Sequence, residues 1–388
     1  FLTQSMRTLY LLHTMGLFST TSKGVILIDI GSASVAGAWM YQKKGEAPVI
    51  CYSTRIDIEV RTDEKVEQSM LRTLEAVCIQ LVREGAPAYS REVGHGKIEI
   101  VLASVAAPWQ DTSIHTVVLS ETHPFVFTRA LMQKTVTGKP PTPDRIISDT
   151  SVISTVLNGY ETEQPWGKRA HKAELTVLTS TLDKAVAKSI TTELRRAFHS
   201  HHIELAAFAP VAYAVLSNLY PLQKEYVLLD VSGSATDALI VKKGVLAGVA
   251  TIPQGVHDLL KAGRGAARGV PGVSAIDQNR NATFGPKVAA AEALWLEGVK
   301  GMLANFASEH PLPQTVFLLA DEDARDFLKR LIDESTLRTL WLSEEPLSVI
   351  ALTPEHTTSV VRARGMAEGD IFLSMLALFY QDRLSTSS

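Results

Sequence analysis

The sequence predicts an α/β protein with two related domains and a small α+β insert in the first of them. Three observations favour this fold class. The chain has 388 residues, of which 46% are hydrophobic and 20% charged, so it is long enough to form two cores. Strand-like and helix-like apolar patterns alternate along most of its length. One pattern, in which an apolar strand ends in Asp before a turn of small residues, occurs twice.

The first half of the chain begins with an alternation of strand and helix patterns. We expect strands at 24–30, 35–42, 49–60 and 97–104, with a helix at 66–84. The next segment, residues 112–182, predicts strands at 114–119, 125–127 and 174–181 and a helix at 128–136. A helix at 183–198 follows, because its apolar residues recur every three or four positions.

The second half returns to the α/β alternation. Its predicted elements are a helix at 210–219, strands at 225–231 and 236–252, a helix at 286–308, a strand at 314–320 and a helix at 323–334. Residues 263–285 combine Gly, Pro, Arg and Asn without a period and predict a mobile loop.

Composition argues against several classes of protein. The net charge is -3, from 38 basic and 41 acidic residues, so the chain lacks the charge excess of a nucleic-acid binder. Cys78 belongs to the apolar face of the 66–84 helix and predicts a buried thiol in a reducing compartment; a disulfide with Cys51 is not expected. No stretch reaches the roughly 18 to 20 apolar residues of a membrane-spanning helix, which predicts a soluble protein. Residues 1–20 predict a flexible segment, with translation starting near Met15.

The repeated pattern is the main functional signal. Residues 24–45 read GVILIDIGSASVAGAWMYQKKG and residues 225–244 read EYVLLDVSGSATDALIVKKG. A single copy has a structural explanation, because tight hairpins use Asp, Gly and Ser for their backbone freedom. Two copies, each leading an α/β unit, favour two facing loops that grip one polyphosphate.

The chemistry of such a clamp identifies candidate site residues. Backbone N–H groups and hydroxyls of small-residue turns bind phosphate oxygens. The predicted phosphate-binding residues are Gly31, Ser32 and Ser34 in the first copy and Ser232, Gly233, Ser234 and Thr236 in the second. Asp29 and Asp230 end the two strands and are predicted to face one cleft, where they would hold the water shell of Mg²⁺.

These residues resemble a known superfamily. The segments LIDIGSASV and LLDVSGSATD are similar to the phosphate motifs of actin, Hsp70 and hexokinase, and residues 15–35, 157–183 and 207–216 resemble the FtsA/PilM branch. The resemblance implies two actin-like (RNase H-like) domains around a nucleotide cleft. It divides the chain into subdomain 1A at 21–104, an FtsA/PilM-type insert (1C) at 105–200 and a second domain at 201–388 with a reduced fourth subdomain.

The chain departs from the superfamily at the adenosine motif. Glycines that normally permit close approach of the nucleotide are replaced by Ala320, Asp321, Glu322 and Asp323, with Ala320 and Asp321 on the predicted adenosine side. Carboxylates near a polyanion predict weak ATP binding and, at most, a slow ATPase. The alternative interpretation is that these acids only cap the helix at 323–334.

The resemblance implies a cytoplasmic scaffold that binds ATP weakly together with Mg²⁺ and recruits a membrane-anchored partner in type IV pilus assembly or cell division. We expect an insert groove within 105–183 to bind the partner's peptide tail by edge-strand addition, which would bring the protein to the inner face of the membrane. Self-association into filaments or dimers is a further implication; nucleic acid is not an expected partner. A small-molecule kinase and a degenerate scaffold without nucleotide are the alternatives.

Two weaker features have structural explanations. The apolar segment at 370–384 resembles a membrane-binding helix, but a core helix is the preferred interpretation. His199, His201 and His202 cluster at a predicted helix end, and without further ligands at metal-like spacing they predict a polar helix terminus. No catalytic residue is identified from the sequence.

Overall fold

The computed structural model describes eight segments of the chain: residues 23–43, 45–59, 64–94, 98–136, 142–263, 285–308, 311–341 and 347–386. The predicted flexible segment at 1–20 lies outside them, as does the predicted mobile loop apart from its two end residues.

The first sheet has six strands in the order β15-β3-β2-β1-β4-β9. They are β1 (Lys23–Ile30), β2 (Ser34–Gln42), β3 (Val49–Asp57), β4 (Ile98–Val105), β9 (Ile203–Ala207) and β15 (Arg362–Met366). The hairpin strands β1, β2 and β3 pair antiparallel, whereas β4 and β9 continue the sheet in parallel.

The second sheet repeats this arrangement. Its order is β12-β11-β10-β13-β14. The strands are β10 (Tyr226–Val231), β11 (Thr236–Lys242), β12 (Val245–Ile252), β13 (Thr315–Ala320) and β14 (Ser348–Ala351). Three antiparallel strands are again followed by two parallel ones. The repeat seen in the sequence is therefore a repeat of sheet topology.

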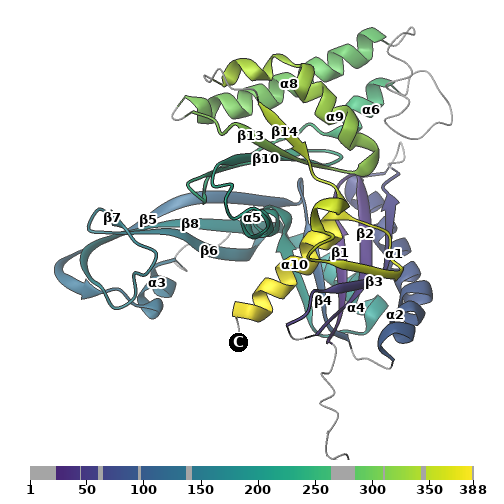
Figure 1. Ribbon diagram of the computed structural model, residues 1–388, viewed down its shortest axis with the longest axis horizontal. Helices are drawn as coiled ribbons and strands as arrows, with labels where there is room; N and C mark the ends of the chain where they lie inside the picture. The colour runs from purple at the N-terminus through teal and green to yellow at the C-terminus, as the bar shows by residue number, and fades with distance from the viewer. Residues whose placement is uncertain are drawn as a thin grey trace, which may run out of the picture.

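Helices form three layers around the two sheets (Figure 1). The outer face of the first sheet is covered by α1 (Val66–Gln80), α2 (Ala86–Val93) and α4 (Lys184–Phe198). The outer face of the second is covered by α6 (Val256–Gly263), α8 (Gly285–Ala307) and α9 (Glu322–Glu334). Between the sheets lie α5 (Phe208–Leu219) and α10 (Ile371–Thr386), and one apolar cluster joins both sheets to these helices.

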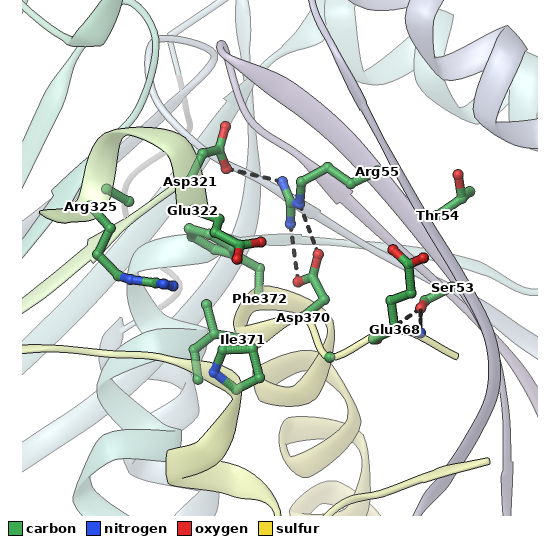
Figure 2. A pocket seen from close by; sticks show the side chains of 13 residues that line it. Ser53, Thr54, Arg55, Asp321, Glu322, Arg325, Glu368, Asp370, Ile371 and Phe372 are labelled. Carbon is green, nitrogen blue, oxygen red and sulfur yellow. Dashed lines mark hydrogen bonds and ion pairs between the residues drawn. The ribbon is translucent and has the colours of Figure 1, made fainter. Parts of the chain in front are cut away.

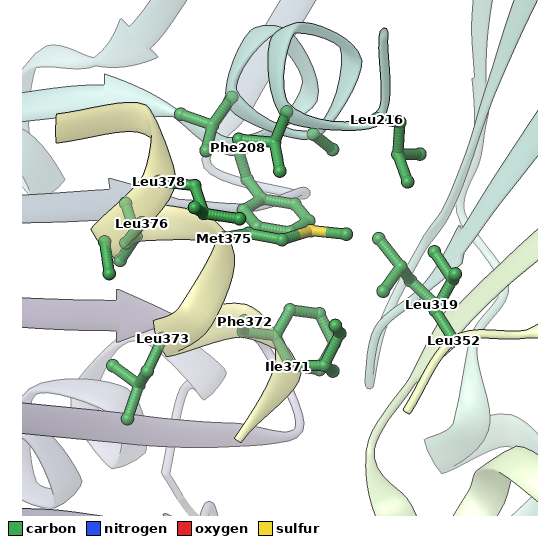
Figure 3. Packing of buried hydrophobic residues seen from close by; sticks show 14 of the residues in the cluster. Phe208, Leu216, Leu319, Leu352, Ile371, Phe372, Leu373, Met375, Leu376 and Leu378 are labelled. Carbon is green, nitrogen blue, oxygen red and sulfur yellow. The ribbon is translucent and has the colours of Figure 1, made fainter. Parts of the chain in front are cut away.

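The C-terminal helix α10 is part of this shared core. Residues 371–378 are all buried, so this part of the helix has no face left for a membrane. Phe372, Met375 and Leu376 pack with Phe208 of α5 and Leu319 of β13 (Figure 3). The preferred interpretation of this segment as a core helix is confirmed.

The insert is a four-stranded sheet with its own small apolar cluster, and in Figure 1 it projects away from the stacked layers. Its order is β5-β8-β6-β7, from β5 (Gln110–Val126), β6 (Arg145–Leu157), β7 (Tyr160–Glu161) and β8 (Arg169–Asp183), with α3 (Arg129–Val136). The two strands predicted at 114–119 and 125–127 form one strand. Its pairing shifts between Ser120 and Phe125, where a bulge accommodates Pro124.

The helix predicted at 66–84 is interrupted. A π-helical turn, Leu81–Gly85, separates α1 from α2. The indole N–H of Trp39 donates to the Leu81 carbonyl over 2.8 Å. The Trp39 ring packs so closely on Gly85 that a Cβ atom at this position would clash with it. A tertiary contact with β2 thus accompanies the change in helix type.

The sheets do not follow the predicted boundary at residue 201. Both β9 and β15 come after it in the chain and pair in the first sheet. The strand predicted at 236–252 is two strands, β11 and β12, and the prediction also omitted β6, β7, β9, β14, β15, α2 and α6. These elements are short or carry mixed polar residues, so the hydrophobic period is weak and pairing with distant strands defines them.

The sequence predicted that the cysteines form no disulfide and that the chain contains no membrane-spanning helix. Cys51 and Cys78 are buried free thiols, and burial raises the pKa of each to about 12. Within the described segments, no helix combines the length and the hydropathy needed to cross a membrane.

Candidate functional site

Two hairpin turns meet between the sheets. Residues 31–33 join β1 to β2, and residues 232–235 join β10 to β11. The hydroxyl oxygens of Ser32 and Ser232 lie 2.9 Å apart, and the Ser234 backbone N–H donates to Ser32 Oγ over 2.8 Å. The two predicted phosphate loops are therefore brought together, but they bind each other.

Gly233 makes this contact possible. A Cβ atom at this position would lie 2.5 Å from the backbone oxygen of Ser32, a distance that only glycine avoids. In the other turn, the Gly31 N–H donates to the Ser34 carbonyl over 3.1 Å. Several donors predicted to bind phosphate are thus used within the protein.

Asp29 lies near the end of β1 and is only 3% exposed. Ser104 of β4 donates to its Oδ1 over 2.9 Å, and Arg55 Nη2 lies 3.1 Å from its Oδ2. Burial raises the pKa of Asp29 to about 6, and the charge of Arg55 opposes part of that shift.

Asp230 occupies the corresponding position on β10. It lines the same small cavity as Asp29, as predicted for two strand ends that face one cleft. Burial raises the pKa of Asp230 well above its usual range, and the negative charges of Asp237, Asp29 and Asp321 raise it further.

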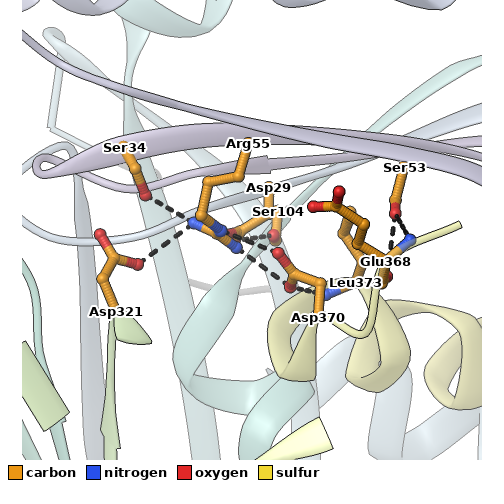
Figure 4. A network of polar contacts seen from close by, with 9 residues as sticks. All are labelled: Asp29, Ser34, Ser53, Arg55, Ser104, Asp321, Glu368, Asp370 and Leu373. Carbon is orange, nitrogen blue, oxygen red and sulfur yellow. Dashed lines mark hydrogen bonds and ion pairs between the residues drawn. The ribbon is translucent and has the colours of Figure 1, made fainter. Parts of the chain in front are cut away.

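Arg55 of β3 dominates the cleft and was missed by the sequence analysis. Its guanidinium contacts three carboxylates: Asp370 at 2.8 and 3.1 Å, Asp29 at 3.1 Å and Asp321 at 3.2 Å (Figure 4). Its Nη1 also donates to Ser34 Oγ over 2.5 Å. The available signal was an arginine near the end of β3, which pairs with the first hairpin.

The turn predicted to face adenosine is also part of this cluster. Ala320 is buried at the end of β13, and Asp321 follows at the N-cap position of α9. The Asp321 side chain makes no capping hydrogen bond and pairs with Arg55 instead. The alternative interpretation of Asp321 as a simple helix cap is therefore wrong.

Thr236 faces away from the cleft. Its hydroxyl donates to the Gln254 carbonyl over 2.8 Å and accepts from the Trp295 indole N–H over 3.0 Å. In this arrangement its side chain supports the contact between β11 and α8, and it is not available to a phosphate.

A second polar network joins the second hairpin to the insert. Gln110 of β5 donates to Asp237 Oδ2 over 2.6 Å, and Thr251 donates to Asp237 Oδ1 over 2.5 Å. Thr112 donates to Gln110 Oε1 over 2.8 Å. Burial raises the pKa of Asp237 to about 6. The sequence did not reveal this network, because its members are far apart in the chain.

The space between the turns is small. The cavity between the turns has a volume of about 20 Å³, measured as the space open to the centre of a water molecule, so it holds roughly one water. Its lining includes Asp29, Asp230, Arg55 and Asp321. A larger pocket of about 100 Å³ adjoins it between β3 and the starts of α9 and α10 (Figure 2). Asp321, Glu322, Glu368 and Asp370 line that pocket together with Arg55 and Arg325.

This cleft does not fit a nucleotide triphosphate with Mg²⁺. The inner cavity is too small for the phosphate chain. The hydrogen-bond donors of the two turns bind groups of the opposite turn, and the charge of Arg55 is already neutralised by its pair with Asp29. Among the residues described, no group of three His, Cys, Asp or Glu side chains is arranged to hold a metal ion. His199 is the left-handed C-cap of α4, consistent with a polar helix terminus.

No protein-family model matches the sequence, and no curated protein matches it either. Among solved structures, a chain of a PilM-PilN type IV pilus biogenesis complex is similar over 92% of this chain and 98% of its own length, with a TM-score of 0.61 and 13% identity. The chain has a PilM-type actin-like ATPase fold. The repeated sheets, the central helices and the insert are the elements of that fold.

Two further solved structures are similar at lower scores. One is a Bacteroides thetaiotaomicron protein with an actin-like ATPase fold and unknown function, with 10% identity, a TM-score of 0.41 and coverage of 94% of this chain and 99% of that one. The other is the ethanolamine utilization protein EutJ from Carboxydothermus hydrogenoformans, with 11% identity, a TM-score of 0.41 and coverage of 91% and 88%.

Proposed function

We propose that this protein is a PilM-type scaffold that binds an extended peptide from a membrane-anchored protein in type IV pilus assembly. One observation carries the proposal: a groove lies between two open strand edges, one on the insert and one on the first sheet. The similar solved structure is a PilM-PilN complex of pilus biogenesis, which supports a pilus role over the alternative role in cell division.

The groove has about 420 Å³ of space, far more than the cavity at the hairpin turns. Ser148 and Asp149 of β6 form one wall, and residues 204–207 of β9 form the other. The helices α5 and α10 contribute Pro210, Val211, Phe379 and Arg383 to its lining. Its apolar and charged parts suit a peptide with both kinds of side chain.

Both strands that border the groove are sheet edges. β9 is the last strand of the first sheet. On β6, the two-residue strand β7 pairs only with Val156 and Leu157, so in the described part of the chain the rest of that edge has no strand partner. Open edges present a row of backbone donors and acceptors, the surface on which an extended peptide adds as a further strand.

This mode of recruitment needs no nucleotide. The geometry of the cleft argues against the ATP and Mg²⁺ binding and the slow hydrolysis predicted from the sequence, whereas self-association stays a prediction. The kinase alternative gains no support, because a cleft that does not accommodate a nucleotide offers no phosphate donor. Recruitment by a membrane protein would bring the scaffold to the inner face of the membrane.

Filling the groove tests the proposal. Ala206 lines it from β9, and Ala206→Trp would place an indole in the path of the peptide. The probe is a fluorescent peptide with the cytoplasmic tail sequence of the PilN-like pilus protein from the same cell, measured by anisotropy. We expect binding by the unmodified protein and at least tenfold weaker binding by the variant, about 1.4 kcal/mol.

The matched control is Ala289→Trp, at an exposed position of α8 in the second domain. It should bind the peptide as the unmodified protein does. Equal affinity of both variants would place the binding surface elsewhere, and no binding by any form would remove the proposed partner.

A further inference from the structure

Arg55 connects three parts of the chain that are distant in sequence. It projects from β3 of the first sheet, while Asp321 follows β13 of the second sheet and Asp370 precedes α10 (Figure 4). We call Arg55 and its partners Asp29, Asp321 and Asp370 the Arg55 cluster. Its Asp321 contact crosses from one half of the molecule to the other.

All five N–H donors of the guanidinium have an acceptor. Nε and Nη2 each donate to one oxygen of Asp370, which makes a bidentate pair. Nη2 also donates to Asp29, and Nη1 donates to Asp321 and Ser34. The guanidinium carbon also lies 4.9 Å from the centre of the Phe372 ring. No donor of Arg55 is left for a phosphate.

The surrounding contacts close the cleft without any ligand. The loops of the two halves bind each other directly through Ser32, Ser232 and Ser234. Ser232 Oγ also lies 3.2 Å from the Ala107 carbonyl, a further contact across the cleft. Phe208 and Phe372, 5.4 Å apart between ring centres, close the apolar side of the cavity.

In a two-domain clamp, a bound nucleotide with its cation supplies charge and hydrogen bonds to both halves at once. Here an internal cation makes such contacts with carboxylates from both halves. We propose that Arg55 takes the place of the nucleotide and its metal ion, so that the Arg55 cluster holds the two halves closed and the closed state does not depend on ATP.

The distance between the halves tests this proposal independently of peptide binding. Spin labels at Ser90→Cys on α2 and Ala290→Cys on α8 report it by pulsed electron resonance, because both sites are exposed. Cys51 and Cys78 are buried and will not take the label. We expect one distance distribution that does not change on addition of millimolar Mg-ATP.

Asp321→Asn is the decisive variant. It removes the charge of the second half while leaving Arg55 paired with Asp29 and Asp370, so the first half keeps its ion pairs. We expect a second, longer distance to appear. Asp326→Asn is the matched control, since this side chain on the same helix is 91% exposed, and it should leave the distribution unchanged.

Two results would overturn the proposal. One is a distance that shifts with Mg-ATP in the chain with intact Arg55. The other is an Asp321→Asn distribution identical to that of Asp326→Asn. If Asp321→Asn fails to fold by circular dichroism, Arg55→Lys takes its place, because a lysine keeps the charge but lacks the fork needed for several carboxylates. Partial opening of Arg55→Lys supports the proposal, and an unchanged distance rejects it.

Discussion

Buried carboxylates gather where the two halves of the molecule meet. Asp29, Asp230 and Asp237 are each 6% exposed or less, and burial is the largest cause of the raised pKa of all three. Such groups resist ionisation because a low-dielectric interior solvates the charge poorly. For Asp237, which accepts hydrogen bonds from the neutral side chains of Gln110 and Thr251, protonation therefore contributes to the stability of the folded molecule, whereas Asp29 is ionised in its pair with Arg55.

The raised pKa of Asp237 makes the stability of the protein depend on pH. Burial raises the pKa of Asp237 from its ordinary value of 3.8 to about 6, so the folded state binds the proton more tightly than the unfolded chain does. The resulting stability is fully present below about pH 4 and is lost as the pH rises through 6. From pH 5 to pH 7 we expect Asp237 to lower the free energy of unfolding by about 1 kcal/mol.

Urea denaturation at pH 5, 6 and 7 measures this contribution. Asp237→Asn cannot titrate, so its stability should fall less over this range than that of the unmodified protein. Parallel pH profiles for the two proteins would show that Asp237 does not titrate near pH 6.

At the scale of single elements, α10 shows how burial on all sides replaces amphipathicity. The helix lies between two sheets and contacts α5, so each face of residues 371–378 meets an apolar partner. Such a helix is stabilised by packing and contributes to the cohesion of both halves.

Truncation of a buried α10 side chain should therefore destabilise the whole protein. Leu376 is fully buried, and Leu376→Ala is expected to lower the free energy of unfolding by about 2–5 kcal/mol. Leu294→Ala on α8 is the control, because that side chain is 59% exposed and its truncation should change stability by about 0.5 kcal/mol or less. Unchanged stability of Leu376→Ala together with loss of vesicle binding would indicate a membrane helix instead.

At the scale of the whole molecule, the insert is attached to the second half as well as the first. The Gln110 side chain of β5 reaches Asp237 of β11, directly behind the second hairpin turn. A change in the position of the insert is therefore coupled to the cleft through a buried hydrogen bond.

Gln110→Leu tests this connection. It leaves one oxygen of a buried carboxylate without its donor, which is expected to lower stability by about 1–3 kcal/mol. Hydrogen exchange measured by mass spectrometry should become faster in both β5 and β11. The exposed Gln164→Leu in the insert serves as control. Faster exchange confined to β5 would contradict a coupling between insert and second half.

The features of this protein that depend on local pattern could be predicted from its amino-acid sequence. The two copies of the strand, Asp and small-residue turn predicted the repeated sheets, and their apolar runs predicted most strands within a few residues. Asp29 and Asp230 were predicted to face one cleft, since equivalent strand ends of repeated units meet there. The core character of α10 was predicted from its apolar segment and from the resemblance to a family whose second domain closes with a similar helix.

What fills the cleft depends on contacts between residues that are distant in the sequence. Arg55 is separated from Asp321 by 266 residues and from Asp370 by 315 residues. A hydrophobic period describes only neighbouring residues, so it cannot predict these contacts. The direct contact of the two turns likewise depends on how the halves approach each other. Short edge strands such as β9 and β15 were missed for the same reason: their pairing is set by distant partners, and local propensity is a weak guide to it.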